Sequence, residues 1–349
     1  MRVAVVGLGW VGREVWLPRL LAHPDFEVRA VVEPRPDAVA RAGALPAGVT
    51  VHAHHEDLAP GEVDAVFVLT PNHTHAEIAG TFLRKGLRVF LEKPTGTQAD
   101  DLRLLADAAQ AGGGRLVLSA AARHRADVRA LADLVRAGTL GTPRLAELSW
   151  VRGRGVPGSA WFTRRESAGG GVLVDLGWHL VDVLHHLWGA SPVRSATAVT
   201  SADFLGREGW SAPWHAAAGP GAAVDVEDQV TALVATEAYG LQLRCAWGSF
   251  SELDRTRIVL HGTAGTAELD CTFGFSPRRA PERSLRLYDG EGVRDLPLPP
   301  AAIGDEYDGQ LDSLAAAFAA DDATAAALGD ADAALTVVAA CYRAAARAR

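Results

Sequence analysis

Two polar clusters in this sequence have residue types and spacings suited to proton transfer. Lys93 stands between Glu92 and Pro94 directly after an apolar run, where an ammonium can stabilise a developing alkoxide on a substrate. The alternative is a solvated lysine in a loop. In the second cluster, Asp175 and His179 are four residues apart. This spacing lets the carboxylate orient the imidazole while the other ring nitrogen exchanges a proton with substrate.

The segment around His179 carries two further polar side chains on the same predicted helical face. Asp182 follows His179 by three residues, and His186 follows Asp182 by four. We interpret Asp182 and His186 as structural hydrogen-bond partners. Two other interpretations of this face remain open: a metal site with mixed histidine and carboxylate ligands, and an ordinary helix whose polar side meets solvent.

A glycine pattern near the start of the chain predicts a bound dinucleotide. Gly7, Gly9 and Gly12 follow a valine-rich run in fingerprint spacing, with Trp10 and Val11 inside the pattern. The first glycine permits the tight strand-to-helix turn, and the second lets backbone N–H groups approach a pyrophosphate. The third lets the helix pack closely on the strand. The helix N-terminus then offers its unpaired donors to the phosphates.

The residues at the end of the next predicted strand indicate whether NAD or NADP is the cofactor. Glu33 lies about twenty residues past the last glycine, where a carboxylate accepts hydrogen bonds from the ribose hydroxyls. Its charge would repel the 2′-phosphate of NADP, which favours NAD as the cofactor. Arg35 weakens this preference, because an arginine there can pair with that phosphate.

Alternating strand and helix signals place these residues on a doubly wound parallel sheet. We expect strands over residues 3–6, 27–32, 63–69, 87–91 and 116–119, with helices over 11–21, 74–85 and 98–111. Ligands of such sheets bind beyond the carboxyl ends of the strands, where residues 70–75, 91–94 and 123–124 lie. Pro71 and Asn72 also fit a plain turn with Thr74 as N-cap. No metal is expected at His73 and His75, because no cysteine or carboxylate ligand set is nearby.

The pattern changes after residue 119 and predicts a second domain. Helices are expected over 127–136, 172–188, 307–320 and 331–346, and strands over 144–151, 225–237, 241–250, 256–260, 266–270 and 285–288. The fold class is therefore α/β, with an N-terminal Rossmann domain over residues 1–121. An α+β domain with an open, largely antiparallel sheet covers residues 122–349, and its C-terminal helix is a candidate to pack back on the first domain. The insert 204–221 is a candidate pocket rim.

Composition excludes several classes of partner. The 349 residues carry a formal net charge of −8, so we expect no nucleic-acid partner. Three widely separated cysteines support neither a disulfide framework nor a zinc ribbon, which indicates a cytoplasmic protein. No apolar run reaches the roughly eighteen residues that span a bilayer, so no membrane partner is expected.

With these residues identified, the chain resembles the Gfo/Idh/MocA oxidoreductases, the family of glucose-fructose oxidoreductase and inositol dehydrogenase. The matching segments are 5–12, 63–75, 92–94, 170–179, 226–228 and 261–268. The resemblance implies that Lys93, Asp175 and His179 are catalytic and that a homodimer or homotetramer forms. It also implies a set of residues around the nicotinamide half of the cofactor: Thr70, Asn72, His75 and Glu92.

One stretch departs from the family pattern. Many relatives have a glycine-aromatic-asparagine-arginine sequence where this chain reads Ser119-Ala-Ala-Ala-Arg-His124, which retains only Arg123. The loop 152–163 and Gly177-Trp178 look like a subgroup of actinobacterial aminoglycoside pathways, in which an NAD enzyme oxidises a ring hydroxyl before transamination. Substrate contacts are then expected at Arg123, Trp161 and Trp178, and the acidic chain would suit a polycationic substrate.

The expected function is NAD-dependent oxidation of a secondary ring hydroxyl to a ketone. The substrate would be a sugar, a cyclitol or an amino sugar such as an aminoglycoside intermediate. One alternative is an NAD-dependent glycosidase of the same fold, which recycles its cofactor. Another is a regulator that senses NAD and a sugar without turnover, although such a sensor needs no proton-transfer set.

Overall fold

The computed structural model describes residues 1–59, 61–212 and 224–347, and the chain divides into two compact units. The first unit comprises Met1–Ser119 and Tyr307–Ala331. The second comprises Ala120–Glu306 and Asp332–Arg349. The C-terminal region is therefore shared, because its first 25 residues, 307–331, belong to the N-terminal unit.

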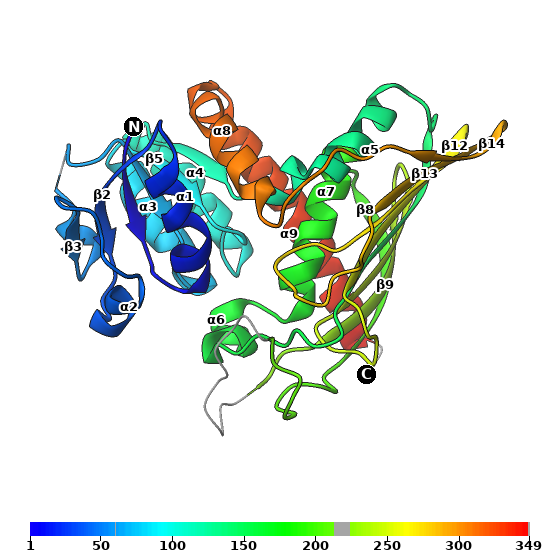
Figure 1. Ribbon diagram of the computed structural model, residues 1–349, viewed down its shortest axis with the longest axis horizontal. Helices are drawn as coiled ribbons and strands as arrows, with labels where there is room; N and C mark the ends of the chain where they lie inside the picture. Colours follow the sequence, from blue (N-terminus) through cyan, green and yellow to red (C-terminus); the bar gives the residue numbers. More distant parts are fainter. Residues whose placement is uncertain (60, 213–223, 348–349) are drawn as a thin grey trace. The chain divides into compact units, whose positions relative to one another are not determined.

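The first unit is built on a six-stranded parallel sheet in the order β3-β2-β1-β4-β5-β6 (Figure 1). Its strands are β1 (Arg2–Val6), β2 (Glu27–Val32), β3 (Thr50–His52), β4 (Ala65–Val68), β5 (Arg88–Leu91) and β6 (Arg115–Leu118). All four residues of β4 are buried, as expected for a parallel strand covered on both faces.

Helices cover both faces of this sheet. They are η1 (Val11–Trp16), α1 (Leu17–Ala22), α2 (Pro36–Arg41), η2 (His55–Asp57), η3 (Asn72–Thr74), α3 (His75–Arg84), α4 (Ala99–Gly112) and α8 (Asp305–Ala319). Phe82 of α3 and Leu105 of α4 join one core cluster with the strands, and Ala327 completes it. Trp16 packs on the aromatic rings of Phe67 and Phe90 elsewhere on the sheet. The predicted doubly wound fold is confirmed.

The second unit is built on an eight-stranded sheet in the order β14-β13-β12-β11-β7-β10-β9-β8. Its strands are β7 (Pro143–Val151), β8 (Val193–Ser201), β9 (Gln229–Thr236), β10 (Gly240–Ala246), β11 (Arg255–Gly262), β12 (Gly265–Cys271), β13 (Ser284–Asp289) and β14 (Gly292–Leu296). Neighbouring strands run antiparallel except β7 and β10, which are parallel. The predicted largely antiparallel sheet is therefore confirmed.

Helices of the second unit lie on one face of its sheet (Figure 1). They are η4 (Ala121–His124), α5 (Ala126–Arg136), η5 (Ala160–Thr163), α6 (Arg165–Ala168), η6 (Leu173–Gly177), α7 (Trp178–Trp188) and α9 (Ala323–Arg347), whose first residues belong to the other unit. Burial alternates along β9, where Val230, Ala232 and Val234 are buried and Leu233 is exposed. This period of two marks a strand with one covered face.

Several elements differ from the sequence-based expectation. The helices expected over 11–21 and 172–188 each begin with a π-helical turn, η1 and η6. The long loop after β7 contains η5 and α6, and α9 begins at Ala323 rather than at 331. Strands β3, β8 and β14 were not among the predicted strands. Single π-turns occur often at functional sites, and these two coincide with the predicted cofactor and catalytic segments.

Candidate active site

The glycine pattern forms a tight turn between β1 and η1. Gly7 has φ +97°, and a Cβ there would lie 2.8 Å from the Leu69 carbonyl oxygen. A Cβ on Gly12 would lie 2.2 Å from the Gly7 carbonyl oxygen, whereas a Cβ on Gly9 would meet no atom within 4 Å. Two of the glycines are thus required by the fold itself. Gly9 instead leaves open space beside its backbone, and the neighbouring Trp10 and Val11 are partly exposed.

Glu33 directly follows β2 and bonds to the glycine turn. Its carboxylate accepts a hydrogen bond from the Leu8 backbone N–H at 2.9 Å and from Arg35 Nε at 2.8 Å. Burial alone would raise the pKa of Glu33, but the Arg35 guanidinium and the backbone N–H groups lower it overall. Glu33 therefore stays ionised at neutral pH. Arg35, the candidate partner for a 2′-phosphate, is paired with Glu33 instead.

The segment after β4 is tied to the segment after β5 by His75. Its Nδ1 lies 2.6 Å from the Pro94 carbonyl oxygen, and its Nε2 lies 2.7 Å from the Thr70 carbonyl oxygen. Burial lowers the pKa of His75, although the two carbonyl groups favour protonation. The imidazole thus joins the two loops. Thr74 occupies the N-cap position of α3, but its hydroxyl contacts Thr70 and does not cap the helix.

Glu92 connects three elements of the first unit behind the predicted lysine. Trp16 Nε1 donates to Glu92 Oε1 at 2.7 Å, and Ser119 Oγ donates to the same oxygen at 2.9 Å. The backbone N–H of Lys93 donates to Oε2 at 3.1 Å. These bonds fix the backbone of the partly exposed Lys93 at the carboxyl edge of the sheet, as the sequence predicts. Asn72, after β4, is buried at the same edge.

Thr95 is a polar residue of this edge that sequence reasoning missed. Its side chain is fully buried, and its Oγ1 has no hydrogen-bond partner among the residues that the structure describes. A buried hydroxyl without a partner is costly, so it marks a place where a bound polar group fits. The open space at Gly9, the ionised Glu33 and this hydroxyl together suit a dinucleotide. The only sequence signal for Thr95 was its position two residues after Lys93.

In the second unit, Asp175 and His179 are the two open positions of a buried helix. The structure describes all of residues 171–184, and each of them except Asp175 and His179 is buried. Asp175 lies in the π-turn η6, and His179 follows one turn later in α7. The His179 ring lies 5.8 Å from that of Trp150, between ring centroids. An aspartate and a histidine four residues apart are thus the partly exposed side chains of an otherwise buried segment.

Two residues, Trp247 and Glu227, hold the start of this helix, and neither role was predicted from the sequence. Trp247 Nε1 donates to Asp175 Oδ2 at 2.9 Å. Glu227 accepts hydrogen bonds from the Leu173 backbone N–H at 3.1 Å and from the Tyr342 hydroxyl at 2.8 Å. Burial raises the pKa of Glu227, despite these donors and a more distant arginine. Glu227 lies in a segment that carries the family resemblance, but the spacing did not indicate its role.

The expected substrate residues have different surroundings. Arg123 Nε donates to Asp182 Oδ2 at 2.9 Å, which confirms Asp182 as a structural partner. Trp178 is only 3% exposed, so its indole packs inside the second unit. Trp161 is partly exposed and lies 4.6 Å from the ring of Phe162, between ring centroids. Arg123 and Trp161 are thus both partly exposed, whereas Trp178 is not.

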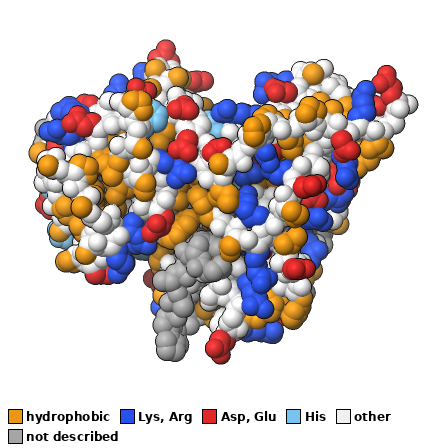
Figure 2. All heavy atoms as spheres, viewed as in Figure 1, with side chains coloured by type: hydrophobic (Ala, Val, Ile, Leu, Met, Phe, Trp, Pro, Cys, Tyr) orange, Lys and Arg blue, Asp and Glu red, His pale blue; other side chains and the backbone are white. Residues whose placement is uncertain are grey.

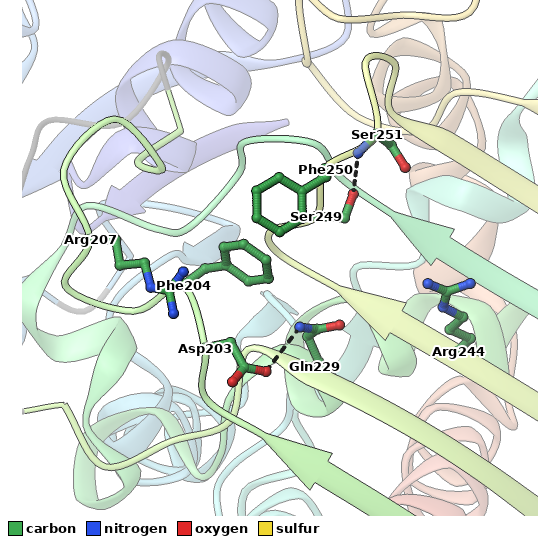
Figure 3. Close-up of a pocket in the computed structure, with 8 residues that line it drawn as sticks. All are labelled: Asp203, Phe204, Arg207, Gln229, Arg244, Ser249, Phe250 and Ser251. Atoms are coloured by element: carbon green, nitrogen blue, oxygen red, sulfur yellow. Dashed lines mark hydrogen bonds between the residues drawn. The ribbon is translucent and has the colours of Figure 1, made fainter.

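A cavity of about 580 Å³ lies elsewhere in the second unit (Figure 3). It contains none of the predicted catalytic residues. Phe204 and Arg207 contribute to it, so the described part of the insert 204–221 does line a pocket. Residues 213–221 of that insert lie outside the described residues. The other lining residues are Asp203, Gln229, Arg244, Ser249, Phe250 and Ser251.

Metal and membrane signals are weak. Within the described residues, no group of three or more histidine, cysteine or acidic side chains is arranged to hold a metal ion. One described helix, α9, is long and apolar enough to cross a membrane by length and composition alone. Core helices of soluble proteins share these properties, and Ala331, Ala334 and Cys341 of α9 are fully buried. Figure 2 shows acidic and basic side chains interspersed over the visible face.

Comparison with known proteins identifies the family. Residues 1–119 match the model of an oxidoreductase family with an NAD-binding Rossmann fold, and residues 128–268 match the GFO/IDH/MocA C-terminal domain. The chain is 44% identical over 321 residues to a protein of Amycolatopsis mediterranei provisionally named as a UDP-kanosamine synthase oxidoreductase subunit. That alignment covers 91% of this chain and 88% of the relative.

Solved structures agree with this assignment. GenD2 from gentamicin A biosynthesis, crystallised with NAD, is 25% identical with a TM-score of 0.74, covering 100% of this chain and 95% of that one. The aldose-aldose oxidoreductase of Caulobacter crescentus is 23% identical with a TM-score of 0.77, covering 100% and 98%, and shares the fold. The chain therefore belongs to the Gfo/Idh/MocA family of NAD-binding oxidoreductases.

Proposed function

We propose that this protein oxidises a secondary ring hydroxyl of a sugar, amino sugar or cyclitol to a ketone with NAD. In this proposal Lys93, Asp175 and His179 form the proton-transfer set. The observation that carries it is the pair of open positions in an otherwise buried helix, which are occupied by an aspartate and a histidine one turn apart. Burying a carboxylate or an imidazole without a partner is costly, and a segment that is otherwise buried most simply carries apolar residues, so the placement of these two groups supports a site that works on a ligand.

Each residue has one task in the proposed reaction. His179 takes the proton of the substrate hydroxyl as general base. Asp175 orients the imidazole and stabilises its charged form. The ammonium of Lys93 stabilises the oxygen as negative charge develops on it. Bound NAD supplies the hydride acceptor at this site. Glu33 and the glycine turn hold the adenosine and pyrophosphate parts of that cofactor.

The relatives narrow the substrate class. The name of the Amycolatopsis relative couples an oxidoreductase to the synthesis of a UDP-linked amino sugar. The structural relative with bound NAD comes from gentamicin A biosynthesis. We infer that the substrate is a hexose on its way to becoming an amino sugar, with a UDP-linked hexose favoured by the higher identity. Oxidation to a ketone would prepare such a sugar for transamination.

Turnover measurements test this function. UDP-hexoses, free hexoses, cyclitols and aminoglycoside precursors are incubated with the protein and NAD, and NADH is followed by its absorbance. We expect a UDP-hexose to give NADH, and Lys93→Ala and His179→Ala each to lower kcat roughly 10²- to 10⁴-fold. Lys85→Ala, at the chain's other lysine, is the matched control and should leave kcat unchanged.

Two results would contradict the proposal. Near-wild-type turnover by both Lys93→Ala and His179→Ala would remove the assigned roles. Cleavage of a glycoside without net NADH, by protein purified with tightly held NAD, would instead identify an NAD-dependent glycosidase.

A further inference from the structure

We propose that Trp247 is a positioning residue, whose indole N–H fixes the Asp175 carboxylate and thereby sets the proton affinity of His179. This inference rests on the proposed function, because it acts through two residues of the proton-transfer set. Trp247 itself touches no reacting atom in this scheme. Its side chain is fully buried behind Asp175.

Two backbone hydrogen bonds of Trp247 and one ring contact hold its indole in place. Trp247 follows the last residue of β10, and its backbone N–H donates to the Asp228 carbonyl oxygen at 2.9 Å. Its own carbonyl oxygen accepts a hydrogen bond from the Gly155 N–H at 2.8 Å. The ring of Phe162 packs against the indole with centroids 6.0 Å apart. The Nε1–H therefore reaches Asp175 from a fixed point.

The donor chemistry of the indole favours one protonation state of the Asp175 carboxylate. An indole N–H donates only and cannot accept, so its partner oxygen must act as acceptor. The bond of 2.9 Å from Nε1 to Oδ2 therefore favours ionised Asp175 and fixes the plane of its carboxylate. A fixed, ionised carboxylate one helical turn before His179 can stabilise the imidazolium that forms when the base accepts a proton.

Other titratable groups surround the same carboxylate. Cys245 on β10 is fully buried, and burial followed by the nearby Asp175 charge raises the pKa of its thiol well above the usual value. Glu227, which lies just before β9, accepts hydrogen bonds from the backbone N–H groups of Gly171 and Leu173 at the start of the same helix. A thiol is only a weak donor and an ionised carboxylate only accepts, so neither group matches the donor that Trp247 supplies. Removal of the indole N–H should therefore leave the Asp175 carboxylate less firmly placed and its ionised form less favoured, so that the imidazolium of His179 becomes less stable.

Substitution of Trp247 by phenylalanine tests this effect, with Trp188→Phe as the matched control. Trp188 ends α7 in the same unit and packs on Tyr239 with ring centroids 5.4 Å apart. In Trp247→Phe we expect kcat to fall roughly ten- to a hundredfold with little change in KM. The acidic limb of the pH profile should move to lower pH, because a less stable imidazolium loses its proton at lower pH. Trp188→Phe should keep the wild-type kcat and profile, and thermal melting of both variants controls for folding.

A second measurement does not depend on turnover. In protein labelled with ¹⁵N-histidine, the His179 signal is assigned by its loss in His179→Asn, and its titration midpoint is measured with and without the Trp247 indole. We expect the midpoint to fall in Trp247→Phe and to stay in place in Trp188→Phe. An unchanged midpoint together with an unchanged kcat overturns the inference. A shifted midpoint in protein that oxidises no sugar would support the contact while refuting the proposed function.

Discussion

Substitution of Gly9 by alanine should separate cofactor binding from folding. A Cβ at this position would meet no protein atom within 4 Å, and Gly9 is absent from the glycines with positive φ. The unfolded chain loses some freedom with alanine, so the free energy of unfolding should stay constant or rise by about 0.4–1 kcal/mol. Any loss of NAD affinity then reports contact with the ligand, because the protein itself accommodates the methyl group.

The expected loss follows from the donors at this turn. If the added methyl group moves the pyrophosphate away from one backbone N–H, a hydrogen bond to a charged group is lost, about 1.5–3 kcal/mol. The dissociation constant of NAD should therefore rise roughly ten- to a hundredfold. Isothermal titration calorimetry measures this constant, and urea unfolding measures stability in parallel.

Gly12→Ala is the matched contrast. Its Cβ would lie 2.2 Å from the Gly7 carbonyl oxygen, so the turn must shift. Such overpacking costs roughly 1–3 kcal/mol, and stability should fall in this variant even without NAD. Wild-type NAD affinity in Gly9→Ala would refute the placement of the pyrophosphate beside Gly9.

Three further variants probe the cofactor site and the second unit. Glu33→Gln should weaken NAD binding about tenfold, because the ribose loses an ionised acceptor, and should reduce the ratio of NAD affinity to NADP affinity. Equal affinities of the wild-type protein for NAD and NADP would contradict this role of Glu33. Thr95→Val should leave stability constant or higher but weaken NAD binding, since the hydroxyl has no partner in the described protein; unchanged binding would leave the hydroxyl without a cofactor role. Asp127→Asn should cost up to about 3–5 kcal/mol of unfolding free energy at neutral pH, because it leaves the buried Arg125 with only the more distant carboxylate of Glu306. Burial would raise the pKa of Asp127, but Arg125 and Arg283 lower it overall, so this contribution is present above about pH 4 and disappears as the pH falls through the lower native value. Urea unfolding from pH 3 to 7 should therefore show a flatter pH dependence in Asp127→Asn, and parallel curves would contradict the assignment.

The sequence predicts the first sheet well because its strands are buried on both faces. A run such as Ala65–Val68 must be apolar throughout, so it stands out from its surroundings. Strand β14 lacks this signal, because four of its five residues are exposed at the edge of the sheet. The start of α9 was missed because Gly329 lies in its first turns, and glycine is a poor helix former that tertiary packing can override.

The candidate site also contains some residues that the sequence predicts and others that it does not. Gly7, Glu33 and Lys93 were found because each has a fixed position relative to a strand end. Trp247 and Asp175 are 72 residues apart, and their hydrogen bond depends on how β10 packs against η6. Thr95 is recognisable only because its surroundings leave the hydroxyl without a partner. Spacing along the chain carries no information about either contact.

The contribution of residues 307–331 to the first unit has a consequence for how the protein is made. Strand β6 is an edge of the parallel sheet, and its Leu116 N–H donates to Thr324 Oγ1 at 3.0 Å. Gln310 Nε2 donates to the Leu118 carbonyl oxygen, and Arg115 binds the carbonyl oxygens of α8 and the turn after it. Thr324 follows Leu116 by 208 residues along the chain. During synthesis β6 must therefore wait for the whole second sheet to be translated before the partners of its free edge exist, and we expect the nucleotide-binding domain to be completed only then.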